Sequence, residues 1–254
     1  MSFGVNEEQT ELQSNNTVQR IKNRGLLLVG TTGDYRPLTF KEEDGRYWGF
    51  GIEMAEAIAK KLDVDVQFVP TSWPTLTKDV LAEPQTFDLA IGGITITDQR
   101  KETMLMSDGY LANGKTILCR VECTDTFHSV SDIDKPEVRV MINPGGTNEK
   151  FAREHLSHST IIIHRKNEEI PELIANGEAD VMVTEITEAP YYVNSNKHLA
   201  APLVETPFTH SFIGVLLRKG QEDLLALVNK VIKQMKEDGS LKELHEKYGL
   251  VYSF

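Results

Sequence analysis

Two glutamates placed three residues apart could carry acid–base chemistry in this chain. Glu185 and Glu188 follow an apolar run, residues 181–183, within the segment ADVMVTEITEAP. A short apolar run of this kind is typical of a buried strand. Residues at the carboxyl end of a parallel strand face the crevice where open α/β sheets bind their ligands. We therefore expect both carboxyl groups near a ligand crevice, where Glu188 is a candidate proton donor.

The alternative for Glu188 is an exposed acid at a helix start that does no chemistry. Thr187 is predicted to cap the helix that follows, and Pro190 fits only its first turn. A helix start favours a carboxylate by ~0.3–1 kcal/mol. A proton donor at neutral pH needs a pKa well above the reference of about 4.3. Burial in a dry cleft and the like charge of Glu185 would raise the pKa far enough, whereas a wet cleft would not.

Two further segments favour the binding of an anion. Arg100 follows GGITIT (residues 92–97) by three residues, and Thr95 and the amides near Gly93 would complete a carboxylate site. In NPGGTNEKF (residues 143–151) the glycines would let a ligand approach the amide groups at a helix start. A surface ion pair and an ordinary strand–helix turn are the respective alternatives. The turn lacks the spacing of a nucleotide P-loop.

Two large aromatic residues lie in predicted polar loops. Tyr35 belongs to TTGDYRPLTF and Trp73 to TSWPTL. Aromatic rings in such loops could cover a flat ligand. Packing between lobes is the alternative.

Composition limits the classes of function. The 254 residues are 40% hydrophobic and carry a net charge of −11, which argues against a nucleic-acid partner. No apolar run is long enough to insert in a membrane. The histidines lack paired ligand spacing, so we expect neither a metal nor an organic cofactor. Cys119 and Cys123 lie four residues apart, and both a local disulfide and two free thiols remain open.

Strands alternate with helices along the chain, which indicates α/β lobes with mostly parallel sheets. We predict strands at residues 26–30, 64–69, 87–91, 138–142, 161–164, 180–183 and 213–217. We predict helices at residues 50–62, 76–82, 148–155, 168–176, 222–237 and 241–248, and turns at 42–49 and 143–147.

An internal echo suggests two similar lobes. FDLAIGGITIT and ADVMVTEITEA both run from an acidic residue through an apolar strand into a polar segment. We expect a polar tail at residues 1–19, a discontinuous first lobe at 20–112 and 209–254, and a second lobe at 113–208. The ligand would then bind in the cleft between the two lobes.

Together these segments resemble the type II periplasmic solute-binding proteins for polar amino acids. The resemblance runs from Leu26 to Tyr248 and is carried by VGTTGDYRPLTF, GFGIEMAEAIAKKL, FDLAIGGITITDQRKE and ADVMVTE. It implies two α/β lobes that close on a small ligand, and a periplasmic or secreted location. The start of the sequence shows no signal peptide, only a polar segment. The family usually has an aspartate where this chain has Gly51.

Within that group, TSWPTL and NPGGTNEKFAR are similar to segments of the bacterial cyclohexadienyl dehydratases. These enzymes convert prephenate into phenylpyruvate and arogenate into phenylalanine. The resemblance implies that Glu188 is the general acid and that Glu185 stands where binding proteins hold the ligand's amine. It assigns Arg100 and Thr95 to a carboxylate site and Tyr35 and Trp73 to the aromatic pair. It assigns Gly146, Thr147 and Asn148 to the anion-binding turn.

Two departures from that pattern bear on the ligand. Glu185 replaces the usual aspartate, and residues 208–217 lack a lysine that the dehydratases carry there. The first could alter the choice between an amino and a keto acid, and the second could remove a contact to a carboxylate. The competing hypothesis is a non-catalytic amino-acid-binding component of an ABC transporter. Its partner would then be a membrane permease.

Overall fold

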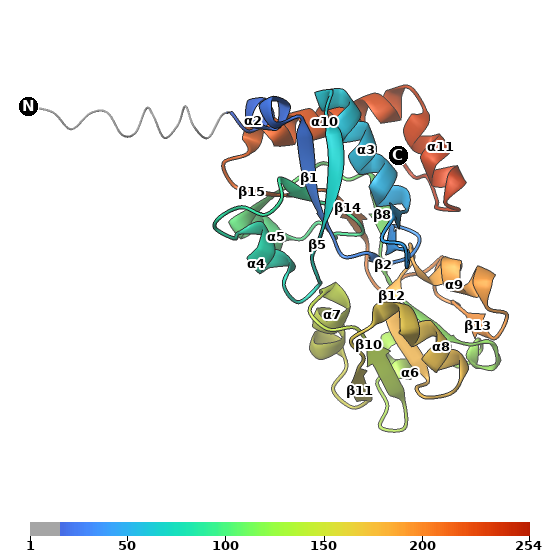
Figure 1. Ribbon diagram of the computed structural model, residues 1–254. Helices are drawn as coiled ribbons and strands as arrows, with labels where there is room; N and C mark the ends of the chain where they lie inside the picture. Colours follow the sequence, from blue (N-terminus) through green and yellow to red (C-terminus); the bar gives the residue numbers. More distant parts are fainter. Residues whose placement is uncertain (1–15) are drawn as a thin grey trace, which may run out of the picture.

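A computed structural model describes residues 16–254, and Figure 1 shows two lobes, each built around its own β-sheet. The expected two-lobed α/β fold is confirmed. Most of the predicted tail, residues 1–15, lies outside the described residues. Helix α2 (Thr17–Arg24) begins inside the range assigned to that tail, because Ile21 anchors an amphipathic helix in the first core.

The two sheets have the same topology. The strand orders are β5-β1-β6-β15-β7 and β11-β10-β12-β9-β13. In each sheet the fourth strand in that order runs against its two neighbours, and the other strands share one direction. The similarity between the two lobes that the sequence suggested is thus also present in their strand order.

Six of these ten strands lie within two residues of predicted runs, whereas β7, β9, β13 and β15 do not. The first sheet contains β1 (Leu26–Thr31), β5 (Asp65–Pro70), β6 (Leu89–Ala90), β7 (Met104–Met106) and β15 (Leu216–Arg218). The second contains β9 (Lys115–Arg120), β10 (Arg139–Ile142), β11 (Thr160–Ile163), β12 (Val181–Glu185) and β13 (Leu199–Ala200).

Helices α3 (Phe50–Leu62) and α10 (Glu222–Glu237) cover one face of the first sheet. Both have the bounds that their apolar stripes predict. Buried side chains of these helices form one cluster with β1, and α11 (Ser240–Lys247) extends it. On the other face, α4 (Leu76–Val80) and β6 contribute to a second cluster, and α5 (Asp98–Thr103) follows the GGITIT segment.

Residues 42–49 contain the predicted turn and also a strand that was not predicted. β2 (Asp34–Tyr35), β3 (Thr39–Lys41) and β4 (Tyr47–Trp48) form a small antiparallel sheet, so the end of that segment is a strand. The tight turn before β4 remains, because the amide of Gly45 donates to the carbonyl of Glu42 at 2.9 Å.

The second sheet is buried on both faces, as its continuous apolar strands predict. In β12, Val181 and Val183 pack into a cluster with Phe151 of α7 (Thr147–His155), whereas Met182 packs into a cluster on the opposite face. The remaining elements of this lobe are α6 (Val130–Ile133), α8 (Ile170–Ala175), α9 (Ala189–Ser195), η1 (Val121–Cys123) and η2 (Asn167–Glu169).

Two antiparallel strands form the connection between the lobes. β8 (Leu111–Asn113) pairs with β14 (Ser211–Ile213). The single strand predicted at residues 213–217 is therefore wrong: β14 belongs to this connection and β15 to the first sheet. Gly214 separates them, and a Cβ there would lie 2.9 Å from Ile96 side-chain atoms. The proposed lobe limits at residues 112/113 and 208/209 lie in or beside this connection.

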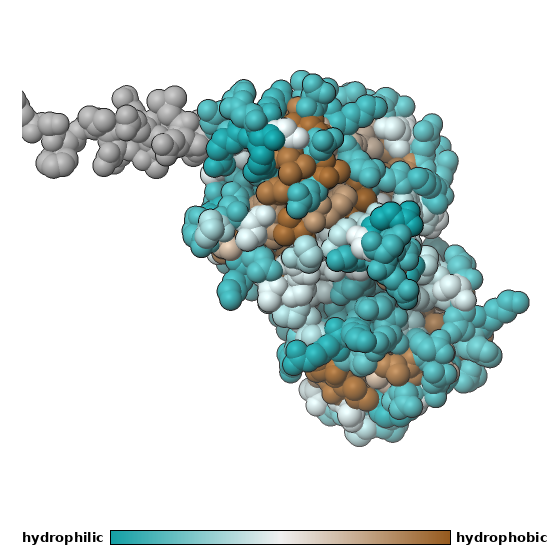
Figure 2. Space-filling model, in the orientation of Figure 1, coloured by the Kyte–Doolittle hydropathy of each residue, from teal (hydrophilic) through white to brown (hydrophobic). Residues whose placement is uncertain are grey.

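The junction of the lobes differs in polarity from the rest of the face that Figure 2 shows. Figure 2 shows apolar patches on each lobe, one of them in the region of β1 and β5, whereas the junction is mostly hydrophilic. Within residues 16–254 no helix is long and apolar enough to cross a membrane.

Candidate functional site

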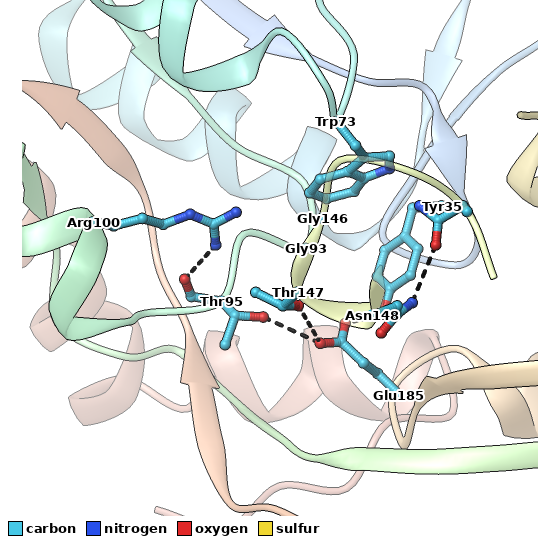
Figure 3. A pocket seen from close by; sticks show the side chains of 10 residues that line it. Tyr35, Trp73, Gly93, Thr95, Arg100, Gly146, Thr147, Asn148 and Glu185 are labelled. Carbon is cyan, nitrogen blue, oxygen red and sulfur yellow. Dashed lines mark hydrogen bonds between the residues drawn. The ribbon is translucent and has the colours of Figure 1, made fainter. Parts of the chain in front are cut away.

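A narrow cavity of about 20 Å³ lies between the lobes. Asn143 and nine of the ten predicted site residues line it, and Figure 3 shows their side chains converging from both lobes. The nine are Tyr35, Trp73, Gly93, Thr95, Arg100, Gly146, Thr147, Asn148 and Glu185. The tenth, Glu188, is not among the lining residues.

The aromatic pair forms one wall of the cavity. The rings of Tyr35 and Trp73 meet edge to face, with centroids 5.8 Å apart. The indole nitrogen of Trp73 donates to Asp34 Oδ1 at 3.0 Å, which fixes the ring. Gly93 has a φ of 86°, and a Cβ there would lie 2.5 Å from the Tyr35 ring. The glycine is therefore required for Tyr35 to reach the cleft.

Arg100 brings a positive charge to the same cavity. Its side chain extends from α5, and Nη1 donates to the carbonyl oxygen of Thr95 at 2.5 Å. Burial lowers the pKa of Arg100, and Glu185 partly offsets this effect. Figure 3 shows the guanidinium directed into the cavity, where its free edge can bind a carboxylate through two parallel hydrogen bonds.

The opposite wall is the turn at the start of α7. The helix begins at Thr147, one residue before the predicted start, and Asn148 is buried. Gly145 has a φ of 87°, and a Cβ there would lie 2.4 Å from Pro74 Cα in the first lobe. The two lobes thus touch backbone to backbone at this glycine, and Gly146, Thr147 and Asn148 at the helix start line the cavity.

Sequence reasoning missed a lysine at the centre of the site. Lys115, on β9, lies directly opposite Glu185, on β12, in the antiparallel register. Its ammonium donates to Glu185 Oε1, Thr147 Oγ1 and Asn148 Oδ1, each at 2.6 Å. The lysine expected within residues 208–217 is absent, and this cation comes from another strand. The feature of the sequence that could have indicated this residue is a lysine at the start of the mostly apolar run KTILCR, residues 115–120.

The carboxylate of Glu185 is fully occupied by protein donors. Oε2 accepts a hydrogen bond from the Tyr35 hydroxyl, and Oε1 accepts from Thr95 Oγ1 at 3.2 Å besides Lys115. Burial raises the pKa of Glu185, but Lys115 and the hydrogen bonds outweigh it and hold the pKa below its usual value. Burial also lowers the pKa of Lys115, an effect that Glu185 opposes. We treat the two as a charged pair at neutral pH.

Glu188 lies behind the cavity wall and is fully buried. Its carboxyl group is hydrogen-bonded to the Thr184 hydroxyl, and Oε1 accepts from Asn167 Nδ2 at 2.6 Å. Burial raises the pKa of Glu188 to about 8, and Glu185 and Asp34 add to the shift. The carboxyl therefore carries its proton at neutral pH.

The start of α9 differs from the predicted cap. Glu188 itself occupies the N-cap position, without a side-chain hydrogen bond to the helix, and Pro190 lies in the first turn as predicted. Thr187 is not the cap, because its hydroxyl donates to Asn113 Oδ1 at 3.3 Å. The exposed helix-start acid is thereby excluded for Glu188.

The two cysteines are not among the residues that line the cavity. Cys119 is buried and Cys123 half-buried, and both are free thiols in the structure. Among residues 16–254, no cluster of three or more histidine, cysteine or acidic side chains could hold a metal ion.

Two α/β lobes joined by paired strands, with polar groups of both lobes around one cleft, define a protein that binds a small ligand between its lobes. A model of the bacterial extracellular solute-binding proteins, family 3, matches residues 27–251. The chain belongs to this family.

Relatives within the family include an enzyme and binding proteins. The cyclohexadienyl dehydratase of Pseudomonas aeruginosa is 36% identical, covering 90% of this chain and 84% of the relative. The L-cystine-binding protein TcyJ of Escherichia coli is 31% identical, covering 91% and 85%. Among solved structures, the ancestral amino acid-binding protein AncCDT-1, described as a precursor of cyclohexadienyl dehydratase, is 39% identical with a TM-score of 0.84, covering 91% and 99%.

Proposed function

We propose that this protein is a cyclohexadienyl dehydratase that converts prephenate into phenylpyruvate, with arogenate as the second substrate to be tested. The observation that carries the proposal is Glu188, a fully buried carboxyl group beside the interlobe cavity whose pKa is raised to about 8. The similarity to the Pseudomonas enzyme supports it.

The reaction requires one proton and a site for two carboxylates. Arg100 binds one carboxylate of prephenate, and the helix start at Thr147 faces the other. Glu188 protonates the ring hydroxyl, which leaves as water while the ring carboxylate leaves as carbon dioxide and the ring becomes aromatic. A positioned general acid contributes about 10²–10⁴-fold to the rate.

Delivery of the proton requires a change of partner. The carboxyl of Glu188 bonds with Thr184 and Asn167 and does not line the cavity. We propose that, when the substrate fills the cavity, this carboxyl exchanges the Thr184 hydroxyl for the substrate hydroxyl.

The second candidate is a binding protein for an amino acid, delivering it to an ABC permease. It is supported by relatives such as TcyJ and the ancestral protein AncCDT-1. The ion pair of Glu185 and Lys115 counts against it, because the acid that would receive a ligand's amine is already occupied. For either function we place the chain outside the cytoplasmic membrane, periplasmic or secreted, on the strength of the family it belongs to.

Incubation with prephenate at neutral pH separates the two functions. A dehydratase forms phenylpyruvate, measured by its absorbance in alkali, faster than the uncatalysed control. A thermal-shift panel of amino acids tests the other function, since a ligand at 100 Kd stabilises a protein by ~2.7 kcal/mol. No phenylpyruvate together with a shift by one amino acid would overturn the dehydratase in favour of transport.

A further inference from the structure

The side chain of Asn167 connects the proposed acid to the opposite lobe. Asn167 opens η2 in the second lobe and is fully buried. Its Nδ2 donates to Glu188 Oε1 at 2.6 Å and to the backbone oxygen of Asp34, on β2 of the first lobe, at 3.2 Å. Both hydrogens of one amide group are thus used, one for the acid and one for the facing lobe.

We infer that Asn167 is a positioning residue, which fixes where the Glu188 carboxyl carries its proton and does so only when the lobes are in contact. The inference rests on the proposed function, because it assigns a role in the same proton transfer. Asn167 does not line the cavity and acts through Glu188.

The orientation of the amide follows from the Asp34 carbonyl. A backbone carbonyl only accepts hydrogen bonds, so the group of Asn167 that faces it must be the NH₂ and not the oxygen. The same NH₂ then meets Glu188 Oε1, and an N–H donor pairs best with the carboxyl oxygen that has no proton. The proton is therefore placed on Oε2, and the rotatable Thr184 hydroxyl, which donates to Oε2 of the charged carboxylate, then becomes its acceptor.

The orientation leaves the other end of the amide without a partner. Asn167 Oδ1 is buried and has no hydrogen bond with the described part of the chain. A buried acceptor of this kind is costly to leave unpaired. The Asp34 carbonyl and Glu188 Oε1 together hold the NH₂ group in place, although the oxygen is left unpaired.

Several ionisable groups surround Glu188, and the effect of Asn167 must be measured against them. The groups that interact with its charge lie on β2, β9, β12 and α9, and they are Asp34, Tyr35, Lys115, Glu185 and Tyr192. Burial dominates the pKa of Glu188, and the bond from Asn167 lowers it. Removal of that donor without admission of water therefore raises the pKa further.

The test is the variant Asn167→Leu, because leucine has the branching of asparagine without its polar atoms. We expect kcat for prephenate to fall about tenfold or more, KM to change less than about twofold, and the basic limb of the kcat profile to move to higher pH. The control is Asn176→Leu, at an exposed asparagine that ends α8. It should leave kcat and its pH profile unchanged.

A lower kcat with an unmoved basic limb, or no change in kcat, would overturn the inference. Titration of the Glu188 carboxyl by ¹³C NMR, assigned with Glu188→Gln, gives a readout that needs no turnover. An unchanged titration in Asn167→Leu overturns the inference even if the wild type is active. If the wild type shows no dehydration but the pKa of Glu188 differs between the wild type and Asn167→Leu, the proposed function is overturned. The inference that Asn167 acts on the Glu188 carboxyl is then supported on its own.

Discussion

Lys115 and Glu185 face each other on neighbouring antiparallel strands, with Nζ 2.6 Å from Oε1. Their pairing occupies the carboxylate that the family resemblance assigns to a ligand's amine. Because Lys115 already neutralises Glu185, the guanidinium of Arg100 is left to bind a ligand carboxylate. We propose that this arrangement favours a ligand without an ammonium group, which describes prephenate better than arogenate or a free amino acid.

Substitution of the lysine should shift selectivity toward amines. In Lys115→Met the carboxylate of Glu185 loses its internal cation, and a ligand ammonium can take that place. We expect the ratio of kcat/KM for arogenate to kcat/KM for prephenate to rise about tenfold or more, because a hydrogen bond from the ligand's ammonium replaces the buried one from Lys115. The control is Lys197→Met, at an exposed lysine. An unchanged ratio would refute the role given to Lys115.

Arg100 should control affinity for a carboxylate. Arg100→Ala removes the guanidinium directed into the cavity, and we expect KM for prephenate to rise about 10- to 100-fold, the cost of one to two hydrogen bonds to a charged group. The neighbouring Lys101→Ala, at an exposed side chain, is the control. Equal effects of the two variants would mean that only the general positive field acts on the substrate.

Contact of the lobes at Gly145 can be tested with a single methyl group. In Gly145→Ala the Cβ would lie 2.4 Å from Pro74 Cα and Pro74 N, so the lobes cannot reach the observed contact. We expect affinity for the ligand to fall at least tenfold. Gly239→Ala is a matched control, because its φ of 83° is similar but no atom lies within 4 Å of the added Cβ. In both variants an alanine must adopt a left-handed backbone conformation, which costs ~1–2 kcal/mol. Only Gly145→Ala should lose ligand affinity, as measured by isothermal calorimetry.

The buried acid should make stability depend on pH. Its pKa in the folded protein is about 8, against a reference of 4.5. Below pH 4.5 both states are protonated, whereas between 4.5 and 8 only the unfolded state ionises freely, so the stability of the folded protein falls as pH rises through this window. The loss is on the order of several kcal/mol.

Glu188→Gln removes that ionisation. We expect the free energy of unfolding of this variant, minus that of the wild type, to increase as pH rises from 5 to 8.5, as measured by urea denaturation. Glu205→Gln, at an exposed glutamate, should follow the wild-type curve. Parallel curves for wild type and Glu188→Gln would show that the carboxyl titrates near its ordinary value.

Periodic features of the sequence were predictable. The apolar stripes of α3 and α10 give helices with the predicted bounds, because each stripe must face a sheet along its whole length. Nine of the predicted site residues meet in one cavity because strand ends and helix starts of both lobes face the same cleft.

Non-local features were not predictable. The pairing of Lys115 with Glu185 depends on strand register, which brings together residues 70 positions apart. The break at Gly214 depends on a close approach of Ile96, and the cap of α9 depends on a bond from Thr187 to Asn113. Each of these is set by tertiary contacts that override a local preference.

The most direct test of the general acid is a comparison of wild type and Glu188→Gln with prephenate. Glutamine keeps the shape of the side chain but has no carboxyl proton to give. We expect phenylpyruvate formation to fall by about 10²-fold or more, while prephenate still binds with an affinity within a few fold of wild type, measured at low temperature by calorimetry. Turnover by Glu188→Gln at a rate comparable to the wild type would contradict the assignment of Glu188 as the proton donor.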